Sequence, residues 1–286
     1  MQANFHTGKI IINESSKNLR RRGRKALSGN WFKAFLTVII AVVLITVPAM
    51  MIDELFGISI NLGERLRNSY SSMGSSIDQD VLEYFDTLTV KTSPASGLYA
   101  LFVAGAITFG LAVYFMKLYR KKNPKISDVI SGFEFYLKST ALFFYMLIFI
   151  ALWFMVPIVG TVLGVIAIIR YSQSFYILID NPSYTVRQCV NESKYLMSGN
   201  KMSYFIMHLS FLGWLLLATI PIIILSVFLA STFDVTKSNI FMSIILLTVG
   251  GIAAYCVQAY IYSTQIAFYE ILTGKEEADV YSPGEY

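Results

Sequence analysis

Residues 139–179 read STALFFYMLIFIALWFMVPIVGTVLGVIAIIRYSQSFYILI, and this stretch decides the fold because Arg170 is its only charged residue. A helix needs about 20 mostly apolar residues to cross the hydrocarbon core of a bilayer, and the stretch has roughly twice that length. Pro157 and Gly160 interrupt it, since proline removes a backbone donor and glycine permits a reversal of direction. The stretch therefore predicts two membrane-spanning helices joined by a very tight turn.

The composition of the whole chain agrees with this prediction. Of its 286 residues, 55% are hydrophobic and only 14% are charged, whereas a soluble globular protein has about 25% charged residues. A soluble fold of this size would lack the charge to cover its surface, so the excess apolar residues must face lipid. The composition excludes a disordered chain, a secreted disulfide scaffold and an ordinary soluble enzyme.

Further apolar stretches lie on both sides of this one. Besides the two helices within 139–179, we expect spans at 31–52, 95–119, 202–230 and 240–269. The predicted fold class is an all-α polytopic membrane protein with six transmembrane helices. The expected parts of the chain are a basic N-terminal segment (1–30), one six-helix membrane domain (31–272) with an outer loop at about 53–94, and a tail (273–286).

The distribution of charge predicts the orientation, because cytoplasmic loops retain lysine and arginine. Basic residues concentrate in 17–25, 117–138 and 187–201, and a chain of six spans places all these segments on one side. The opposite side carries the acids Asp53, Glu54, Glu64, Asp78, Asp80, Glu83, Asp86 and Asp234. Both termini are therefore expected in the cytoplasm. Within the outer loop, the apolar spacing predicts a short amphipathic helix at 77–88.

Two kinds of cytoplasmic segment are expected to contact lipid. The basic clusters at 17–25 and 117–125 suit anionic phospholipid head groups, at about 1 kcal/mol per basic residue near the surface, and nucleic acid is not expected as a partner. A helix at 184–197, capped by Ser183, is expected to lie in the interface. Its apolar face, predicted to point toward lipid, consists of Val186, Cys189, Val190, Leu196 and Met197.

The sequence also contains an internal similarity. The segments LSGNWFK (27–33) and MSGNKMS (197–203) each connect a basic amphipathic stretch to an apolar span, and ISGF (130–133) is a weaker third copy. The even-numbered spans end alike, with YFM at 114–116, FYIL at 175–178 and FYEIL at 268–272. This pattern predicts three helical hairpins, each preceded by a cytoplasmic interfacial helix.

Several of these segments carry a family resemblance. They are RYSQSFYILIDNP (170–182), MSGN (197–200), LSFLGW (209–214), ALSGNW (26–31) and FYE (268–270). With these segments the chain resembles domain of unknown function 975, a group of uncharacterised bacterial integral membrane proteins, from about residue 15 to 272. The resemblance implies a bacterial inner membrane and a six-helix fold. It implies no catalytic residues, because none is established for the family.

The residues that bear chemistry do not predict an enzyme. The chain has two histidines, His6 and His208, and neither has a second ligand nearby in the sequence. Metalloprotease, nucleophile-elbow and phosphate-loop motifs are all missing from the sequence. We expect no catalytic residue, no metal and no cofactor, and we expect His208 to donate a hydrogen bond in helix packing.

Arg170 is the most informative residue, because it lies near mid-membrane, where a charge costs roughly 2.5–3.5 kcal/mol. No acid lies within an apolar span to pair with it, and only Asp180, Glu192 and Glu270 at the inner edge could reach it. It is either a structural arginine or part of an anion site, with Gln258 as a further polar neighbour. The candidate ligand-binding residues are Arg170, Tyr171, Gln173, Asp180, Gln265 and Glu270.

The leading hypothesis is a non-enzymatic membrane protein that binds lipid or an amphipathic anionic ligand within the helix bundle. One alternative is a transporter or transporter subunit. The other is an envelope-stress or antimicrobial-peptide resistance protein, with which the acidic outer loop is compatible. A lateral, lipid-facing groove around Arg170 would favour the first hypothesis, and opposed half-helices around a pore would favour transport.

Overall fold

The computed structural model describes residues 10–61, 64, 67–69, 72, 89–157, 159–232 and 246–276. The chain divides into two compact units. Unit 1 comprises residues 1–41, 103–215 and 255–286, and unit 2 comprises residues 42–102 and 216–254. The outer helix expected at 77–88 lies outside the described residues.

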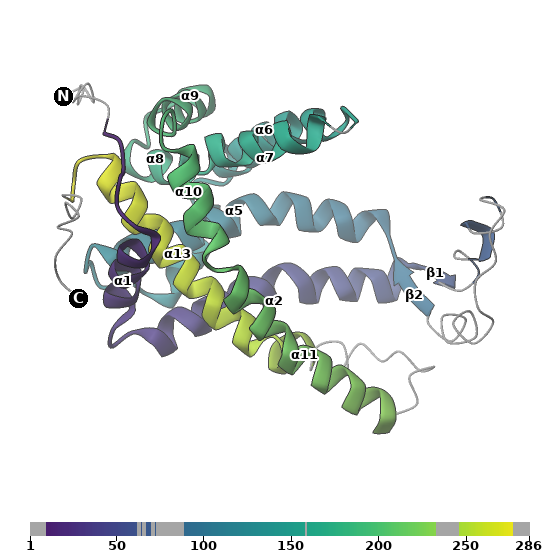
Figure 1. Ribbon diagram of the computed structural model, residues 1–286. Coiled ribbons are helices and arrows are strands. Elements are labelled where there is room, and N and C mark those ends of the chain that lie inside the picture. Colours follow the sequence, from purple (N-terminus) through teal and green to yellow (C-terminus); the bar gives the residue numbers. More distant parts are fainter. Residues whose placement is uncertain are drawn as a thin grey trace. The chain divides into compact units, whose positions relative to one another are not determined.

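The described chain is almost entirely helical, with one antiparallel pair of short strands (Figure 1). The α-helices are α1 (Ser16–Leu27), α2 (Trp31–Phe56), α5 (Pro94–Tyr119), α6 (Tyr136–Phe154), α7 (Val159–Tyr171), α8 (Ser174–Asp180), α9 (Val186–Leu196), α10 (Lys201–Leu209), α11 (Leu212–Thr232) and α13 (Ile252–Leu272). Two further elements are the 3₁₀-helix η1 (Ile126–Phe133) and the π-helix η2 (Leu246–Gly250). The strands are β1 (Ile58–Asn61) and β2 (Thr89–Thr92).

Five helical segments of the described chain are long and apolar enough to cross a membrane. They are Trp31–Phe56, Pro94–Tyr119, Tyr136–Phe154, Val159–Asp180 and Lys201–Phe228. This finding identifies a membrane protein, and the five segments coincide with five of the expected spans. The sixth expected span begins outside the described residues, and its described part consists of η2 and α13.

The predicted division of residues 139–179 into two helices is confirmed. Helix α6 ends at Phe154 and α7 begins at Val159. The turn is tight enough to require glycine, because a Cβ atom at Gly160 would lie 2.1 Å from the carbonyl oxygen of Trp153. The second half of the stretch contains an additional break between α7 and α8, at Ser172 and Gln173, which the apolar pattern did not predict.

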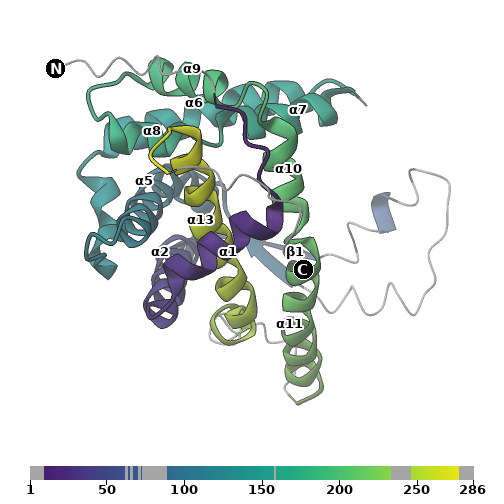
Figure 2. The same ribbon diagram turned by 60° about the vertical axis from the view of Figure 1, so that its left-hand side comes forward.

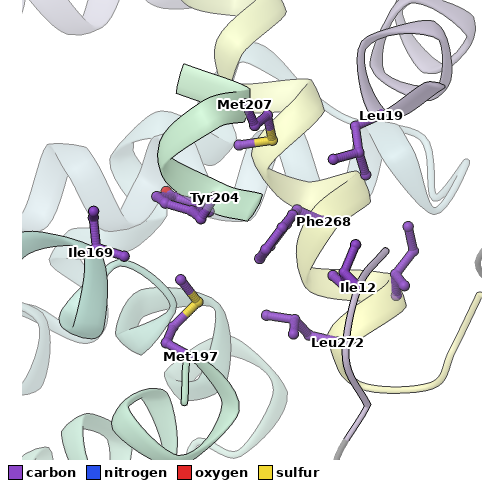
Figure 3. Packing of buried hydrophobic residues seen from close by; sticks show 9 residues of the cluster. Ile12, Leu19, Ile169, Met197, Tyr204, Met207, Phe268 and Leu272 are labelled. Carbon is purple, nitrogen blue, oxygen red and sulfur yellow. The ribbon is translucent and has the colours of Figure 1, made fainter. Parts of the chain in front are cut away.

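The hydrophobic core of unit 1 joins segments that are far apart in sequence (Figure 3). Side chains from the segment before α1, from α1, α7, α10 and α13, and from the C-cap of α9 meet there and are at most 8% exposed. The core consists of Ile12, Leu19, Ile169, Met197, Tyr204, Met207, Phe268, Ile271 and Leu272.

The extended segment before α1 is held by two side chains of the α9–α10 region. The backbone N–H of Ile12 donates to Oδ1 of Asn200 at 2.8 Å, and Nδ2 of Asn200 donates to the carbonyl of Ile10 at 2.9 Å. Oγ of Ser203 donates to the carbonyl of Ile12 at 3.0 Å. The asparagine thus satisfies the backbone of an extended chain in the way that a neighbouring β-strand would, and Ile12 is directed into the core.

Helix α9 differs from the prediction in two respects. Its N-cap is Thr185, not Ser183, because Thr185 and Gln188 form a reciprocal capping box. Its apolar face does not point toward lipid: Cys189, Val190 and Met197 are fully buried against protein. The amphipathic pattern predicts the helix, but a pattern of this kind cannot distinguish a lipid surface from a protein surface.

Helix α1 crosses α13 at a position without a side chain (Figure 2). A Cβ atom at Gly23 would lie 2.5 Å from Oγ1 of Thr264 and 2.9 Å from its backbone nitrogen. Oγ of Ser263 donates to the carbonyl of Gly23 at 2.9 Å. Small residues therefore allow the two backbones to approach closely, as is common where helices pack in membranes.

The 3₁₀-helix η1 packs on α5 by the same means. A Cβ atom at Gly110 of α5 would lie 1.9 Å from the carbonyl oxygen of Val129, and one at Gly132 of η1 would lie 1.9 Å from the carbonyl oxygen of Ala106. Each glycine thus faces the backbone of the opposite element. Either close approach is possible only without a side chain.

Two of the three predicted repeat junctions have matching backbones. Gly29, between α1 and α2, has φ = 78°, and Gly199, between α9 and α10, has φ = 87°. In both junctions the following asparagine donates its N–H to the carbonyl three residues earlier, at 2.8 and 3.1 Å. The third junction differs, because Gly132 lies inside η1 and lacks a positive φ.

Within unit 2, α2 and α5 are tied together by polar contacts. Oδ1 of Asp53 accepts hydrogen bonds from the backbone N–H of Ser93 and from Oγ of Ser96, both at 2.6 Å. The hydroxyl of Tyr99 donates to the carbonyl of Leu44 at 2.8 Å. Strands β1 and β2 pair between these two helices in the chain. Asp53, one of the acids of the expected outer loop, therefore closes the base of that loop.

The packing of η1 on α5 predicts opposite effects for two glycines of the same helix. Gly110→Ala should destabilise the protein by about 1–3 kcal/mol, because the new methyl group overlaps the backbone at Val129. Gly97→Ala should be neutral or stabilising, because a Cβ atom there meets no heavy atom within 4 Å. Thermal unfolding of both variants in detergent checks this. Equal melting temperatures would contradict the close approach of η1 to α5.

Candidate functional site

Three helices of unit 1, α5, α8 and α13, direct charged residues at their ends into one group, the end cluster (Arg120, Asp180, Glu270 and Lys275). Arg120 directly follows α5, and its Nη1 and Nη2 atoms donate to the two oxygens of Asp180 at 2.7 and 3.0 Å. Its Nε donates to Oε1 of Glu270 at 2.7 Å. One guanidinium therefore binds one carboxylate through two parallel bonds and a second carboxylate through its remaining edge.

The end cluster is largely closed to solvent and internally neutralised. Nζ of Lys275 donates to Oδ2 of Asp180 at 2.5 Å, and the hydroxyl of Tyr269 donates to the same oxygen at 2.8 Å. The Asp180 and Glu270 side chains are only 11% and 7% exposed. Burial opposes the charge of Arg120, but the two carboxylates outweigh it and raise the pKa of its guanidinium. The cluster is therefore an ion-pair network that holds helix ends together.

A second ion pair connects Arg22 of α1 to Glu276, the residue directly after Lys275 of the end cluster. Nη1 of Arg22 lies 2.7 Å from Oε1 of Glu276, and Nε of Arg22 donates to Oε1 of Glu14 at 3.0 Å. The hydroxyl of Tyr119 donates to Oε2 of Glu276. These contacts fix the basic helix α1 by specific partners, in addition to any attraction to lipid.

A cavity of about 480 Å³ lies among α5, α6, α7, α10 and α13 of unit 1. Most of its wall is apolar, and its polar groups come from the region of the α7–α8 break and from α10 and α13. It is lined by Thr108, Phe143, Met146, Leu147, Ile150, Val165, Ile168, Ile169, Tyr171, Ser172, Phe175, Tyr204, Phe205, His208 and Gln265.

A chain of hydrogen bonds supports the polar side of this cavity. Nδ1 of His208 lies 3.0 Å from the carbonyl of Tyr204, which can only accept, so Nδ1 carries the hydrogen. Nε2 of His208 then accepts from Nε2 of Gln265 at 2.9 Å. Oε1 of Gln265 accepts from the hydroxyl of Tyr176 at 3.1 Å. His208 is thus a neutral member of a helix-packing network, with both ring nitrogens engaged.

The break between α7 and α8 is stabilised by a serine of α9. Oγ of Ser193 donates to the carbonyl of Arg170 at 2.7 Å and accepts from the backbone N–H of Gln173 at 3.2 Å. Ser172 adds a bond from its Oγ to the carbonyl of Ile169 at 2.8 Å. Inside a membrane, backbone groups released from a helix need such partners. Helix α9 therefore belongs to the structure of the span.

Arg170 lies beside this break, away from the end cluster. Its side chain is half-buried, and among the described residues no carboxylate pairs with it. Its sequence neighbour Tyr171 is buried, and Nζ of Lys194 lies 5.4 Å from the centroid of the Tyr171 ring.

The structure separates the six candidate residues into three places. Tyr171 and Gln265 line the cavity. Asp180 and Glu270 belong to the end cluster, where Arg120 binds them. Gln173 is fully buried at the helix break, and Arg170 stands beside it.

Sequence reasoning missed Arg120, Lys194 and Lys275 as members of these sites. The sequence pattern places Arg120 only in a basic connection between spans, where it contributes to the predicted orientation. A signal was present, because Arg120 and Asp180 follow the matching aromatic ends of the second and fourth spans by similar distances. If the predicted repeat is genuine, opposite charges at its equivalent positions favour contact between the two span ends, whereas counting charges to assign orientation treats them as independent.

Comparison with known proteins gives one match. The family described as "Protein of unknown function (DUF975)" matches residues 12–168 and 158–276, which is nearly the whole chain. Neither a curated protein nor a solved structure matches the chain.

The geometry of the end cluster predicts a large effect of one substitution. Arg120→Gln leaves Asp180 and Glu270 buried without their main cation, and removing one partner of a buried ion pair costs about 3–5 kcal/mol. Thermal unfolding in detergent should show the loss, and Asp180→Asn in the same chain should recover part of it. Lys122→Gln removes the same charge from an exposed position and is the control. Equal melting temperatures for the two single variants would show that the cluster contributes nothing.

Proposed function

Since the chain belongs to the DUF975 family of proteins of unknown function, we propose its function from the geometry of unit 1. It is a non-enzymatic integral membrane protein that binds a lipid or an amphipathic anionic ligand in its helix bundle. The observation that carries this proposal is the cavity of about 480 Å³ among α5, α6, α7, α10 and α13.

The size and lining of the cavity suit an acyl chain. Small-molecule sites are usually concavities of about 300–1,000 Å³ with mostly apolar walls and a few polar groups that orient the ligand. The wall is built by side chains such as Leu147, Ile150 and Val165, and the polar groups are gathered near Tyr171 and Gln265. A ligand with an apolar chain and a polar end fits both parts of this lining.

The network around His208 favours binding over catalysis. A general base needs a nitrogen that is free to accept a proton from a substrate. Nε2 of His208 already accepts from Gln265, and Nδ1 donates to the carbonyl of Tyr204. The histidine therefore acts as part of the wall.

The proposed topology has six spans, with both termini in the cytoplasm of a bacterium and the spans in its inner membrane. The end cluster supports this arrangement, because Arg120, Asp180 and Glu270 follow or end the second, fourth and sixth expected spans. Three such ends lie on the same side of the membrane, and can therefore meet, only if the chain crosses the membrane an even number of times between them. The basic segments 17–25 and 117–125 are then on the cytoplasmic side, where anionic phospholipids are the proposed partners.

Packing within unit 1 supports the proposed repeat of three hairpins. Each short helix that precedes an odd-numbered span contacts an even-numbered one: α1 contacts α13, η1 contacts α5, and α9 contacts the α7–α8 break. Each contact involves a glycine or serine. The contact of α1, near the start of the chain, with α13, near its end, closes this series of contacts into a ring. Such a ring is expected if three similar hairpins are arranged around a common centre.

The topology has a direct test by labelling. In a chain with Cys189 and Cys256 replaced by serine, a cysteine at Ser72 should react with an impermeant thiol reagent in intact cells. A cysteine at Asn123 should react only after the cells are opened, because it follows the expected second span on the cytoplasmic side. Labelling of position 123 in intact cells would overturn the orientation.

The ligand cavity is tested by filling it. Leu147→Trp combined with Val165→Trp places large side chains at two positions of the wall and should reduce binding of oleoyl amphiphiles by at least about tenfold, since a filled cavity excludes the chain. Native mass spectrometry of the purified protein gives the bound fraction. Ile148→Trp combined with Val162→Trp is the control, because these side chains are exposed on the same helices outside the cavity lining. Equal binding by the two double variants would exclude the cavity as the binding site.

A further inference from the structure

Helix α9 brings its cations to a defined place beside the cavity. Ser193 is held at the α7–α8 break by two hydrogen bonds, at 2.7 Å to the carbonyl of Arg170 and at 3.2 Å from the N–H of Gln173. The next residue, Lys194, consequently has its ammonium 5.4 Å from the centroid of the Tyr171 ring. The position of this ammonium is therefore set by the packing of two helices.

Within the described part of the chain, three cations of this region have no carboxylate partner. Among the described residues, Arg170, Arg187 and Lys194 take part in no ion pair, and the edge acids Asp180 and Glu270 are bound by Arg120. Partial burial and then the charges of Arg170 and Arg187 lower the pKa of Lys194. Positive charges held close together without an internal anion are relieved by an anion from outside.

The cations are connected to the cavity through one side chain. Tyr171 lies under the ammonium of Lys194 and also lines the cavity. An anionic group held by Lys194 would therefore be next to an apolar chain held in the cavity. This arrangement matches an amphiphile with a charged head.

We propose that Arg170 and Lys194 form the binding site for a phosphate head group of the amphiphile, an inference that rests on the proposed function of the cavity. A phosphate suits the site because its several oxygens can accept bonds from cations on two different helices. The arginine guanidinium supplies a planar fork for two of these oxygens, and the lysine supplies a point charge. The site selects an anionic over a neutral head on the same chain.

The test compares two ligands that differ only in the phosphate. Oleoyl lysophosphatidic acid and monooleoylglycerol share one chain and the glycerol, and native mass spectrometry of the purified full chain gives the affinity for each. The wild type should prefer the phosphate ligand by at least about tenfold, as expected for charge-assisted hydrogen bonds. Lys194→Gln and Arg170→Gln should each remove most of this preference, because each weakens binding of the phosphate ligand.

Two further variants separate a specific site from charge and folding effects. Lys194→Arg keeps the charge and should keep most of the preference. Lys122→Gln removes one exposed charge elsewhere and should keep all of it. Circular dichroism melts verify that each variant is folded. Retention of the full preference in folded Lys194→Gln and Arg170→Gln would overturn the inference.

The failure of this inference can be distinguished from the failure of the proposed function. If the Leu147→Trp and Val165→Trp chain binds both ligands like the wild type, the cavity proposal fails. If that chain loses both ligands while Lys194→Gln keeps the phosphate preference, only the head-group site fails. Inorganic phosphate is the third probe: competition by it as strong as that by the lipid would show a free-phosphate site and overturn the connection to the cavity.

Discussion

The arrangement of unit 1 depends on the binding of two carboxylates by Arg120. The residue directly follows α5, and through Asp180 and Glu270 it holds the ends of α8 and α13 within hydrogen-bond distance. Near a membrane an unpaired buried carboxylate is costly, so any packing of these helix ends that separated the three side chains would be disfavoured. The ion pairs thus select one register for three helices whose apolar surfaces alone would permit several. Gly110 and Gly23 then allow η1 and α1 to approach this frame closely.

The same interaction determines which charges remain for a ligand. Asp180 and Glu270 are two of the three acids expected to reach Arg170, but Arg120 binds both of them, and Lys275 also pairs with Asp180. Arg170 therefore retains its charge beside the cavity, with Lys194 for a neighbour and without an internal partner among the described residues. Because Arg120 binds both Asp180 and Glu270, the helix ends are neutralised and neither carboxylate is available to the cations at the α7–α8 break.

Much of the fold could be predicted from apolar length alone, including the division at Pro157 and Gly160, because the cost of exposing polar backbone to lipid leaves few alternatives. The turns at Gly29 and Gly199 could also be predicted, because both glycines adopt a positive φ that other residues disfavour. The surroundings of α9 could not be predicted, because a helix face buried against protein and one buried against lipid carry the same kinds of side chain. Of the candidate residues, Tyr171 and Gln265 line the cavity, whereas Asp180 is bound by Arg120, because the partner of Asp180 depends on which helix ends meet. Which helix ends meet is a property of the tertiary structure, and the spacing of residues within one segment does not determine it.

The break in the fourth span connects these observations. Interrupting a helix within the membrane releases backbone donors and acceptors, which must find partners in protein. Ser193 provides them at Arg170 and Gln173, so the break requires α9 to lie against it. Tyr171 and Ser172, at the same break, line the cavity. Once Ser193 is fixed there, the position of Lys194 follows from the helix, and a cation is placed at the edge of an apolar cavity. The hydrogen bonds that Ser193 makes to the backbone at the break therefore also position the ammonium of Lys194 for the proposed head group.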